Sequence, residues 1–259
     1  MNIELYEVKD VSKKVAIVTG GGNGLGRAVA VKLASQGVNV AVVDLAEGPG
    51  HETVDLVKEQ GAEAIFVQAD VRKAEDVKHY VDETVKAFGT IDMFYNNAGI
   101  SGPGKRFVEN TIEEIDLVLG INLHGALYGL KYVLEVMLKN GGGSIVNTSS
   151  TAGLVGQETV GSYSATKHGI VGITKTIAVE YAREGIQVNA ISPGTTETPM
   201  VAEYRKANSE QVESVLAAIP QRRLGKPEEV AELVCFLLNG EAKYINGAVI
   251  PIDGGFTAQ

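Results

Sequence analysis

Short apolar segments alternate with helix-forming segments along the whole chain. Seven of them are rich in Val and Ile and end near Gly, Asp, Asn or Ser: 14–20, 39–44, 64–70, 91–99, 143–150, 186–194 and 248–255. Such runs are typical of strands buried on both faces of a parallel sheet. Segments between them, such as RAVAVKLASQG with Gly37 as a stop, have helical spacing. The alternation predicts βαβ units, and so a doubly wound parallel α/β sheet of about seven strands with helices on both faces.

No Pro/Ser-rich linker or internal repeat divides the 259 residues, of which 44% are hydrophobic. That share is enough for one sizeable core, so we expect residues 1–259 to form one domain. The section at about 195–226 is longer than an ordinary connection. Long connections in compact domains tend to be lids or binding loops, and we expect a substrate loop there.

The composition limits which classes of binding partner and which cellular compartment are expected. A formal charge of -9, from 23 basic and 32 acidic residues, argues against a nucleic-acid or anionic-membrane partner. The one cysteine, Cys235 in ELVCFLL, excludes an intrachain disulfide and is interpreted as a buried structural thiol. The N-terminus has no signal-peptide core, and no uninterrupted apolar run is long enough to cross a bilayer. We expect a cytoplasmic protein.

The first predicted strand runs into TGGGNGLG at 19–26, which a predicted helix follows. A Gly-rich stretch is often only a turn. Here Gly20, Gly24 and Gly26 would permit a tight turn, close backbone approach to a pyrophosphate and helix-to-sheet packing. The helix N-terminus would offer free N–H groups to the anion. The loop lacks the Gly-Lys-Ser/Thr ending of a nucleotide-triphosphate loop, so it predicts dinucleotide binding.

Asp44 closes the second predicted strand. A carboxylate there can accept hydrogen bonds from adenosine ribose hydroxyls and would repel a 2′-phosphate, although Asp is also a good helix cap. Leu45 follows it, and the glycine-rich loop carries Asn23 where a basic residue could have stood. Nothing is placed to neutralise a 2′-phosphate, so the sequence favours NAD over NADP.

Tyr163 and Lys167 stand four residues apart in GSYSATKHG. If 161–184 is a helix, both side chains share one face. Taken alone they would be an ordinary helix pair, but a nearby ammonium, with the positive ring of an oxidised nicotinamide, would favour phenolate and lower the phenol pKa. Ser150 ends the fifth predicted strand, where ligands of open α/β sheets bind, and its hydroxyl could hold a substrate oxygen.

These features together resemble the short-chain dehydrogenase/reductase family, of the compact single-domain NAD-dependent type with a Rossmann fold, across nearly the whole chain. The matching segments are TGGGNGLG at 19–26, Asp70-Val71, NNAG at 96–99, Asn122 in INLHG, Ser150 in NTSS, YSATK at 163–167, PGTTETPM at 193–200 and YINGAVIPIDGG near the C-terminus. Any one of these motifs alone would be weak, and their order and spacing make the resemblance specific.

The resemblance implies a role for each catalytic position. Tyr163 would be the general acid/base, and Lys167 would lower its pKa and hold the nicotinamide ribose hydroxyls. Ser150 would orient the carbonyl oxygen. Asn122 would hold a water that links Lys167 to solvent, and could also cap or stabilise a kink within a helix. No metal is needed, and the four histidines, His51, His79, His124 and His168, are scattered singly.

The resemblance also implies a set of cofactor contacts: Gly20, Asn23, Gly24, Leu25, Gly26, Asp44, Leu45, Asp70, Val71, Asn97, Ala98, Gly99, Tyr163, Lys167, Pro193, Gly194, Thr196 and Thr198. Asp70 and Val71 would flank the adenine, and 97–99 would border the adenosine ribose. Residues 193–198 would face the nicotinamide, with the Thr196 backbone and the Thr198 hydroxyl near its carboxamide. Relatives more often have a plain aliphatic residue at position 196.

We therefore expect an NAD-dependent oxidoreductase that interconverts a secondary alcohol and a ketone. The predicted pocket walls, 100–102, 151–157, Met200, Val201 and Tyr204, are mostly small or apolar and favour a neutral, hydrophobic or cyclic small molecule, although Arg106 and Arg205 could fold over the site. One alternative is a 3-oxoacyl-[acyl-carrier-protein] reductase that uses NADPH, and a remote one is a non-catalytic dinucleotide sensor. The family implies a homotetramer, assembled through 111–138, 161–184 and the C-terminal strand.

Overall fold

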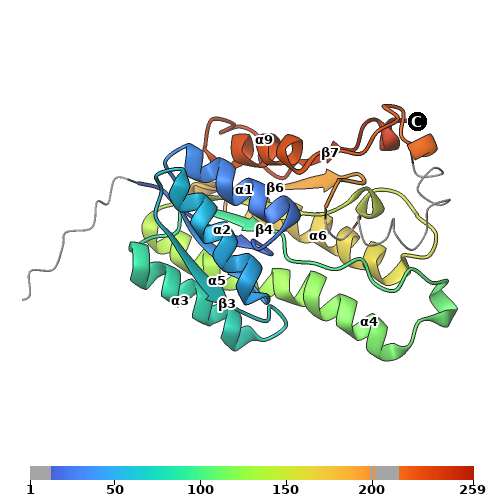
Figure 1. Cartoon of the computed structure of the whole chain (residues 1–259), viewed down its shortest axis with the longest axis horizontal. Helices are drawn as coiled ribbons and strands as arrows, with labels where there is room; N and C mark the ends of the chain where they lie inside the picture. Colours follow the sequence, from blue (N-terminus) through green and yellow to red (C-terminus); the bar gives the residue numbers. More distant parts are fainter. Residues whose placement is uncertain (1–12, 199–200, 202–215) are drawn as a thin grey trace, which may run out of the picture.

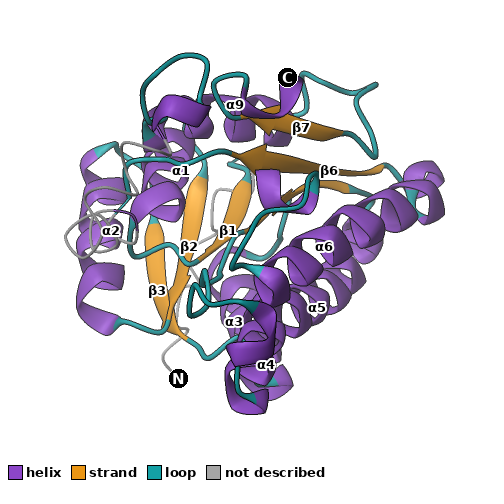
Figure 2. Cartoon of the chain, turned by 90° about the vertical axis from the view of Figure 1, so that its right-hand side faces the viewer, coloured by secondary structure: helices purple, strands orange, loops and turns teal. Residues whose placement is uncertain are grey.

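The computed structural model describes residues 13–198, 201 and 216–259. Within them, seven strands form one parallel sheet in the order β3-β2-β1-β4-β5-β6-β7 (Figures 1 and 2). Their bounds are β1 (Val15–Thr19), β2 (Asn39–Asp44), β3 (Ala64–Gln68), β4 (Met93–Asn96), β5 (Gly143–Thr148), β6 (Ile186–Pro193) and β7 (Val249–Ile252). The predicted doubly wound α/β sheet is confirmed, and the predicted strand bounds exceed the observed ones by one to three residues at most ends.

Helices cover both faces of the sheet (Figure 2). They are α1 (Gly24–Ser35), α2 (Glu47–Glu59), α3 (Ala74–Phe88), α4 (Ile112–Leu119), α5 (Gly125–Asn140), α6 (Gly161–Glu180) and α9 (Pro227–Leu238). Side chains alternate along each strand, so Val18 joins one core cluster with α1, α2 and α9, while Ile17 joins another with α3, α5 and α6. The buried Cys235 lies in the first cluster, as its apolar setting predicts.

The strand order reverses at β1. β1 pairs with β2 on one side and with β4 on the other. The chain segments that follow β1 and β4 therefore leave the sheet in opposite directions. The carboxyl ends of β1 and β4 are therefore the usual place for a ligand in an open α/β sheet. Thr19, Asp44, Asn96 and Thr148, at the ends of their strands, all lie at this edge.

The predicted helix over 111–138 is two helices joined by a π-helical turn at Gly120–His124. The whole run, Ile112–Asn140, is long and apolar enough to span a bilayer, and 44% of its most apolar window is buried inside the protein. α5 buries Leu130, Val133 and Met137 in the second core cluster. Core helices pass the same test of length and composition, and this placement is that of a core helix.

One predicted helix ends earlier than expected, and one predicted loop lies partly outside the described residues. The helix expected over 161–184 ends at Glu180, and a short 3₁₀ turn, Ala182–Glu184, leads from it into β6. The expected substrate loop at 195–226 is described only at 195–198, 201 and 216–226, where Thr196 bridges to Gly225. Met200, Tyr204 and Arg205 lie outside the described residues.

Candidate active site

The glycine-rich loop between β1 and α1 makes a tight turn. Gly20 and Gly24 have positive φ angles of 61° and 51°, which residues with a Cβ seldom adopt. A Cβ on Gly26 would collide with the carbonyl of Gly20, so only glycine allows α1 to start this close to the turn. Asn23 is the N-cap residue, but its side chain makes no capping hydrogen bond, and the first turn of α1 carries no acidic residue. The uncapped N–H groups of α1 therefore suit a pyrophosphate, as the sequence predicts.

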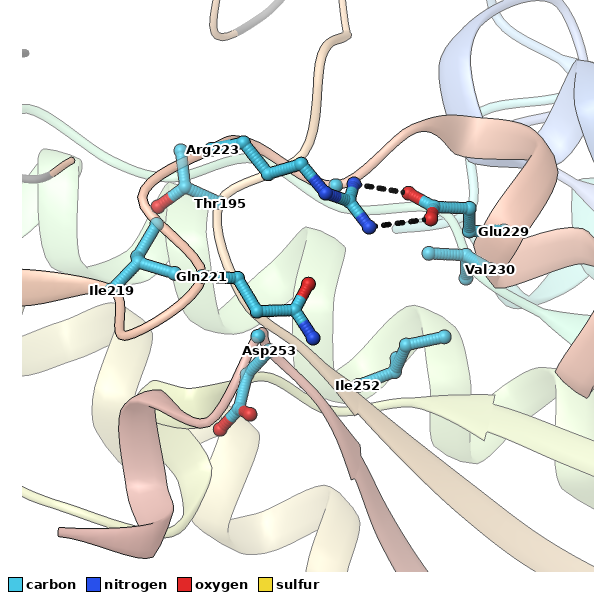
Figure 3. Close-up of a pocket in the computed structure, with 10 residues that line it drawn as sticks. Thr195, Ile219, Gln221, Arg223, Glu229, Val230, Ile252 and Asp253 are labelled. Atoms are coloured by element: carbon cyan, nitrogen blue, oxygen red, sulfur yellow. Dashed lines mark hydrogen bonds and ion pairs between the residues drawn. The ribbon is translucent and has the colours of Figure 1, made fainter.

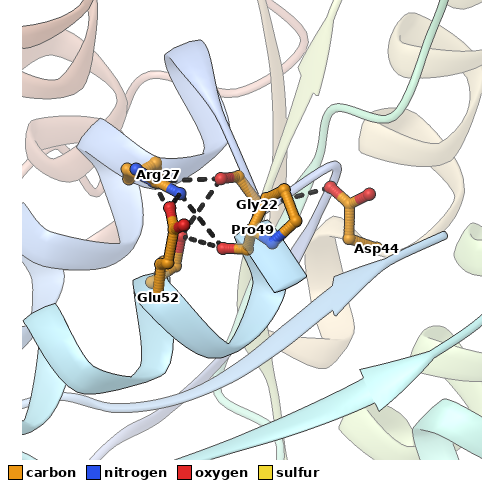
Figure 4. Close-up of polar contacts among 6 residues, drawn as sticks. Gly22, Arg27, Asp44, Pro49 and Glu52 are labelled. Carbon is orange, nitrogen blue, oxygen red and sulfur yellow. Dashed lines mark hydrogen bonds and ion pairs between the residues drawn. The ribbon is translucent and has the colours of Figure 1, made fainter. Parts of the chain in front are cut away.

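Asp44 is held by two backbone amides at the end of β2, and Figure 4 shows the one from Gly22. Gly22 N donates to one carboxylate oxygen at 2.8 Å, and Ala46 N donates to the other at 3.0 Å. The carboxylate thus caps no helix directly, because α2 starts at Glu47 with Ala46 as its N-cap. A Cβ on Gly22 would lie 2.9 Å from the same carboxylate oxygen, so Gly22 belongs to the site although the sequence alone did not single it out. Gly22 is the third glycine of TGGGNGLG, and its place in this motif could have indicated its role.

Asp70, predicted to flank the adenine, forms a two-pronged ion pair with Arg72. Arg72 Nε donates to Asp70 Oδ1 at 2.9 Å, and Arg72 Nη2 donates to Asp70 Oδ2 at 2.5 Å. These bonds lower the pKa of the Asp70 carboxyl, which is therefore a fixed anion. Val71 packs against Gly125, where a Cβ would lie only 2.8 Å from the valine methyl. Arg72 was missed in the sequence, since a single arginine after a strand carries no distinctive signal.

The NNAG motif ties neighbouring strands together at their carboxyl ends. The Thr19 hydroxyl accepts hydrogen bonds from the N–H groups of Asn97 at 2.9 Å and Ala98 at 3.1 Å. The Asn97 amide donates to the carbonyl of Thr19 at 3.0 Å and accepts from the hydroxyl of Thr148 at 3.2 Å. Asn97 therefore joins β1, β4 and β5, and the contacts of 97–99 with an adenosine ribose stay a prediction.

The predicted catalytic side chains come together at the ends of β5 and α6. Lys167 Nζ lies 5.5 Å from the centre of the Tyr163 ring and donates to the carbonyl of Thr148 at 2.7 Å. The Ser150 hydroxyl acts on the Tyr163 phenol and lowers its pKa, which places the two groups beside each other. Ser150 Oγ also accepts from the N–H of Ala152 at 3.2 Å, which fixes the serine at the start of a 3₁₀ turn. The three side chains predicted to act together are thus neighbours.

Burial sets the electrostatics of this trio. It raises the pKa of the Tyr163 phenol, and the Ser150 hydroxyl offsets this only in part. Burial also lowers the pKa of Lys167 to about 8, and its side chain is only 4% exposed. In the chain alone the net effect is thus a raised phenol pKa, and the lowering expected from Lys167 together with an oxidised nicotinamide stays a prediction. Burial disfavours the charged form of both groups: the phenolate of Tyr163 and the ammonium of Lys167 that would stabilise this phenolate.

Asn122 lies inside the π-helical turn and is 1% exposed. Its Oδ1 accepts from the N–H of Ile100 at 2.8 Å, and its Nδ2 donates to the carbonyl of Ile100 at 2.8 Å. The amide therefore fastens the loop after β4 to the interrupted helix, and the kink-stabilising alternative stays a prediction. Its predicted role of holding a water near Lys167 stays a prediction.

The loop after β6 is braced against the C-terminal segment. Gly194 N donates to the carbonyl of Ile252 at 3.0 Å, and a Cβ on Gly194 would lie 2.9 Å from Asp253 Cα. The hydroxyl of Thr196 donates to the carbonyl of Gly194 at 3.1 Å, so the threonine at this position does not bury an unpaired hydroxyl. Thr198 Oγ1 accepts from the N–H of Val201 at 3.4 Å.

Two cavities flank the segment that contains Ile219. One, of about 220 Å³, lies beside the residue that follows Ser150 and is lined by Thr151, Gln157, Gly194, Thr195, Ala218, Ile219 and Phe256. Thr151 and Gln157 were predicted as walls. Ile219 and Phe256 were not, because distant parts of the chain bring them there. Arg106, which could have folded over the site, is exposed at the start of a 3₁₀ turn.

The second cavity, of about 160 Å³, contains an arginine that is already paired (Figure 3). Arg223 donates to both carboxylate oxygens of Glu229 at 2.7 Å, which lowers the pKa of Glu229 to about 2. Its charge is thereby committed within the protein. Among the described residues, no three His, Cys, Asp or Glu side chains lie together as metal ligands would.

The chain is similar in sequence to known oxidoreductases. A family model described as enoyl-(acyl carrier protein) reductase matches residues 20–257. Levodione reductase of Leifsonia aquatica is 42% identical over 95% of this chain and 94% of the relative. Cyclohexanol dehydrogenase of an Acinetobacter species is 39% identical over 96% of each. A short chain dehydrogenase/reductase of Aspergillus oryzae is 39% identical over 94% of this chain and 95% of its own length.

Solved structures match the fold closely. Levodione reductase has a TM-score of 0.91 at 42% identity, covering 95% of this chain and 98% of that one. NAD⁺-bound xylitol dehydrogenase has a TM-score of 0.91 at 33% identity, covering 95% and 100%. A single-residue variant of actinorhodin polyketide ketoreductase with NADPH has a TM-score of 0.92 at 35% identity, covering 97% and 100%. Both kinds of nicotinamide dinucleotide thus occur among similar structures.

Proposed function

The chain belongs to the short-chain dehydrogenase/reductase family, and from that premise we propose that it uses NAD(H) on a neutral, hydrophobic or cyclic secondary alcohol or the matching ketone. Like the relatives named above, it is an oxidoreductase that acts on CH–OH groups. The observation that carries the cofactor proposal is the Asp44 carboxylate, held by Gly22 N and Ala46 N at the end of β2. An anion fixed at this point suits ribose hydroxyls and disfavours a 2′-phosphate.

The surroundings of Asp44 support the same choice. Leu45, the next residue, is 61% exposed and brings no charge. Arg27, the arginine of the glycine-rich loop region, donates to the carbonyls of Gly22 and Pro49 and to Glu52 (Figure 4). Its guanidinium is therefore already bound to groups of the protein itself.

The side chains at the end of β5 support a proton-transfer role. In alcohol oxidation, the Tyr163 oxygen would take the hydroxyl proton while Ser150 holds the same substrate oxygen by hydrogen bonding. Lys167, anchored on the Thr148 carbonyl, would supply positive charge beside the phenol. The nicotinamide, when bound, supplies the hydride acceptor or donor. Because burial raises the pKa of Tyr163, the phenol needs the further positive charge that an oxidised nicotinamide would bring.

The cavity beside Ser150 supports a neutral substrate. Its walls combine the apolar Ile219, Ala218 and Phe256 with the hydroxyl of Thr151 and the amide of Gln157. The nearby Arg223 is paired with Glu229, so it is not free to clamp a carboxylate. The relatives named levodione reductase and cyclohexanol dehydrogenase favour a ring-shaped molecule.

A second candidate is reduction of an acyl-carrier-protein-bound ketone with NADPH. The family-model description and the likeness to a polyketide ketoreductase favour it. The net charge of -9 counts against it, because an acidic carrier protein needs a basic docking surface.

A spectrophotometric screen separates these candidates. Purified protein is mixed with NAD or NADP and a panel of cyclic, linear and steroidal alcohols, and nicotinamide absorbance at 340 nm is followed. We expect turnover with NAD and a cyclic alcohol. A strong preference for NADP, with activity on a carrier-bound ketone, would select the second candidate. NAD binding with no turnover on any substrate would instead support a non-catalytic sensor.

We also propose a cytoplasmic homotetramer. Exposed apolar side chains on α4 and α6, namely Ile112 and Val179, support burial of these helices in an assembly. The free buried Cys235 is compatible with a reducing compartment. Light scattering on the protein as it elutes from a size-exclusion column would give the mass of the assembly. Fractionation of the source cells would give the compartment.

A further inference from the structure

We propose that Arg27 is a positioning residue for the adenosine end of the cofactor site, because it holds Gly22 in the orientation that keeps the Asp44 carboxylate in place. The inference rests on the proposed NAD dependence and deepens it. It assigns part of the discrimination against a 2′-phosphate to a residue that need not touch the cofactor.

Arg27 joins the glycine-rich loop to the first turns of α2 (Figure 4). Its Nε donates to the carbonyl of Gly22 at 2.9 Å and to the hydroxyl of Thr53 at 3.0 Å. Its Nη2 donates to the carbonyl of Pro49 at 3.1 Å and to Glu52 at 2.8 Å. One planar guanidinium therefore sets the distance between the loop and the helix that follows Asp44.

Gly22 is the residue through which this contact reaches the site. Its carbonyl is held by Arg27, and its N–H donates to Asp44 Oδ2 at 2.8 Å. There is little free space around it, since a Cβ would lie 2.9 Å from the Asp44 carboxylate and 3.2 Å from Pro49. The two groups belong to adjacent peptide planes that meet at the Gly22 Cα, so a displacement of this Cα would move both of them. The position of the carboxylate thus depends on both ends of one residue.

The hydrogen bonds from Arg27 to the carbonyls of Gly22 and Pro49, rather than its ion pair with Glu52, hold the loop in place. The Glu52 side chain is 67% exposed and that of Arg27 is 27% exposed, so solvent screens their attraction. Thr53 is fully buried, and its hydroxyl reaches the same two carbonyls, Gly22 at 3.3 Å and Pro49 at 3.1 Å. Arg27 and Thr53 together satisfy carbonyls that would otherwise be free to turn.

The test measures binding of ADP-ribose and of 2′-phospho-ADP-ribose by calorimetry, which needs no substrate. Wild type should bind ADP-ribose more tightly. In Arg27→Met we expect ADP-ribose to bind about tenfold more weakly, as for loss of a charge-assisted hydrogen bond, with 2′-phospho-ADP-ribose little changed. kcat at saturating NAD should stay within about twofold, while KM for NAD rises in step. Glu52→Gln should have a smaller effect than Arg27→Met.

Lys32→Met is the matched control. Lys32 also lies on α1 and pairs with one carboxylate, that of Glu232 at 2.6 Å, but it contacts neither the loop nor α2 in that pair. It should leave both affinities unchanged. If Arg27→Met does not fold, Thr53→Val removes a hydrogen bond to the same carbonyl, and Thr53→Ser should restore ADP-ribose binding.

Unchanged ADP-ribose affinity in folded Arg27→Met would overturn the proposal. So would selective loss of 2′-phospho-ADP-ribose binding, because Arg27 would then be a phosphate ligand. A wild-type protein that prefers 2′-phospho-ADP-ribose would contradict the NAD proposal itself, independently of any variant.

Discussion

Lys167 Nζ donates a 2.7 Å hydrogen bond to the carbonyl of Thr148, and this bond fixes α6 to the end of β5. Tyr163 comes from the helix, and Ser150 lies two residues beyond the carbonyl that accepts the bond. The lysine therefore orients the other two groups besides carrying charge. Ser149, whose hydroxyl donates to the carbonyl of Lys167 at 3.0 Å, strengthens the same junction.

Tyr163→Phe should remove the acid/base group while leaving the pocket filled. We expect kcat to fall by about 10²–10⁴, the usual contribution of a positioned proton donor or acceptor. NAD binding, measured by calorimetry, should change by less than about threefold. A Tyr163→Phe enzyme that kept wild-type turnover would remove the tyrosine from the mechanism.

The buried Lys167 should make stability depend on pH. Its pKa is about 8 in the folded protein, against the ordinary value of 10.5 for an exposed lysine. Between these values the unfolded chain binds more protons, so the free energy of unfolding rises with pH in that range. The burial cost is present in full below pH 8 and is relieved above it.

We expect the stability advantage of Lys167→Met over wild type to shrink by about 2 kcal/mol between pH 7 and pH 9.5. Urea unfolding of both proteins at several pH values, without cofactor, measures this difference. Comparing the two cancels groups common to both. A constant difference across the range would mean that the ammonium is not desolvated.

Asn122→Ala should destabilise the protein strongly. It leaves the N–H and the carbonyl of Ile100 without the partner that now satisfies both. We expect a loss of about 2–4 kcal/mol in the free energy of unfolding. Asn140→Ala is the control, because that exposed amide donates one hydrogen bond, to Thr90 at 2.9 Å, and should cost less than about 1 kcal/mol. Equal losses in the two variants would contradict the clasp assigned to Asn122.

Gly26→Ala should prevent the dinucleotide loop from closing. The new Cβ would meet the backbone carbonyl of Gly20, which cannot move without displacing β1 from α1. NAD affinity should fall at least about tenfold, and stability by about 1–3 kcal/mol, as for other overpacked sites. In Gly172→Ala, on α6, the added methyl has no neighbour within 4 Å and should be neutral or slightly stabilising. Normal NAD affinity in Gly26→Ala would argue against this turn as the pyrophosphate site.

The periodicity of the sequence was sufficient to predict the strands, their parallel arrangement and the edge where the site lies. These properties depend on short-range patterns: apolar runs of strand length, helical spacing and glycine after a strand. The same reasoning located Asp44, Ser150 and the Tyr163/Lys167 pair, because a strand end or a four-residue spacing determines where each lies.

Tertiary packing decided the rest, since it depends on residues far apart in the chain. Gly22 meets Asp44 because β1 pairs with β2, and Arg27 meets Pro49 because α1 packs beside α2. Phe256 joins the wall beside Thr151 across a long stretch of the chain. The direction of the Tyr163 pKa shift followed from burial. A sequence can place an ammonium beside a phenol, but desolvation of both is set by everything that surrounds them.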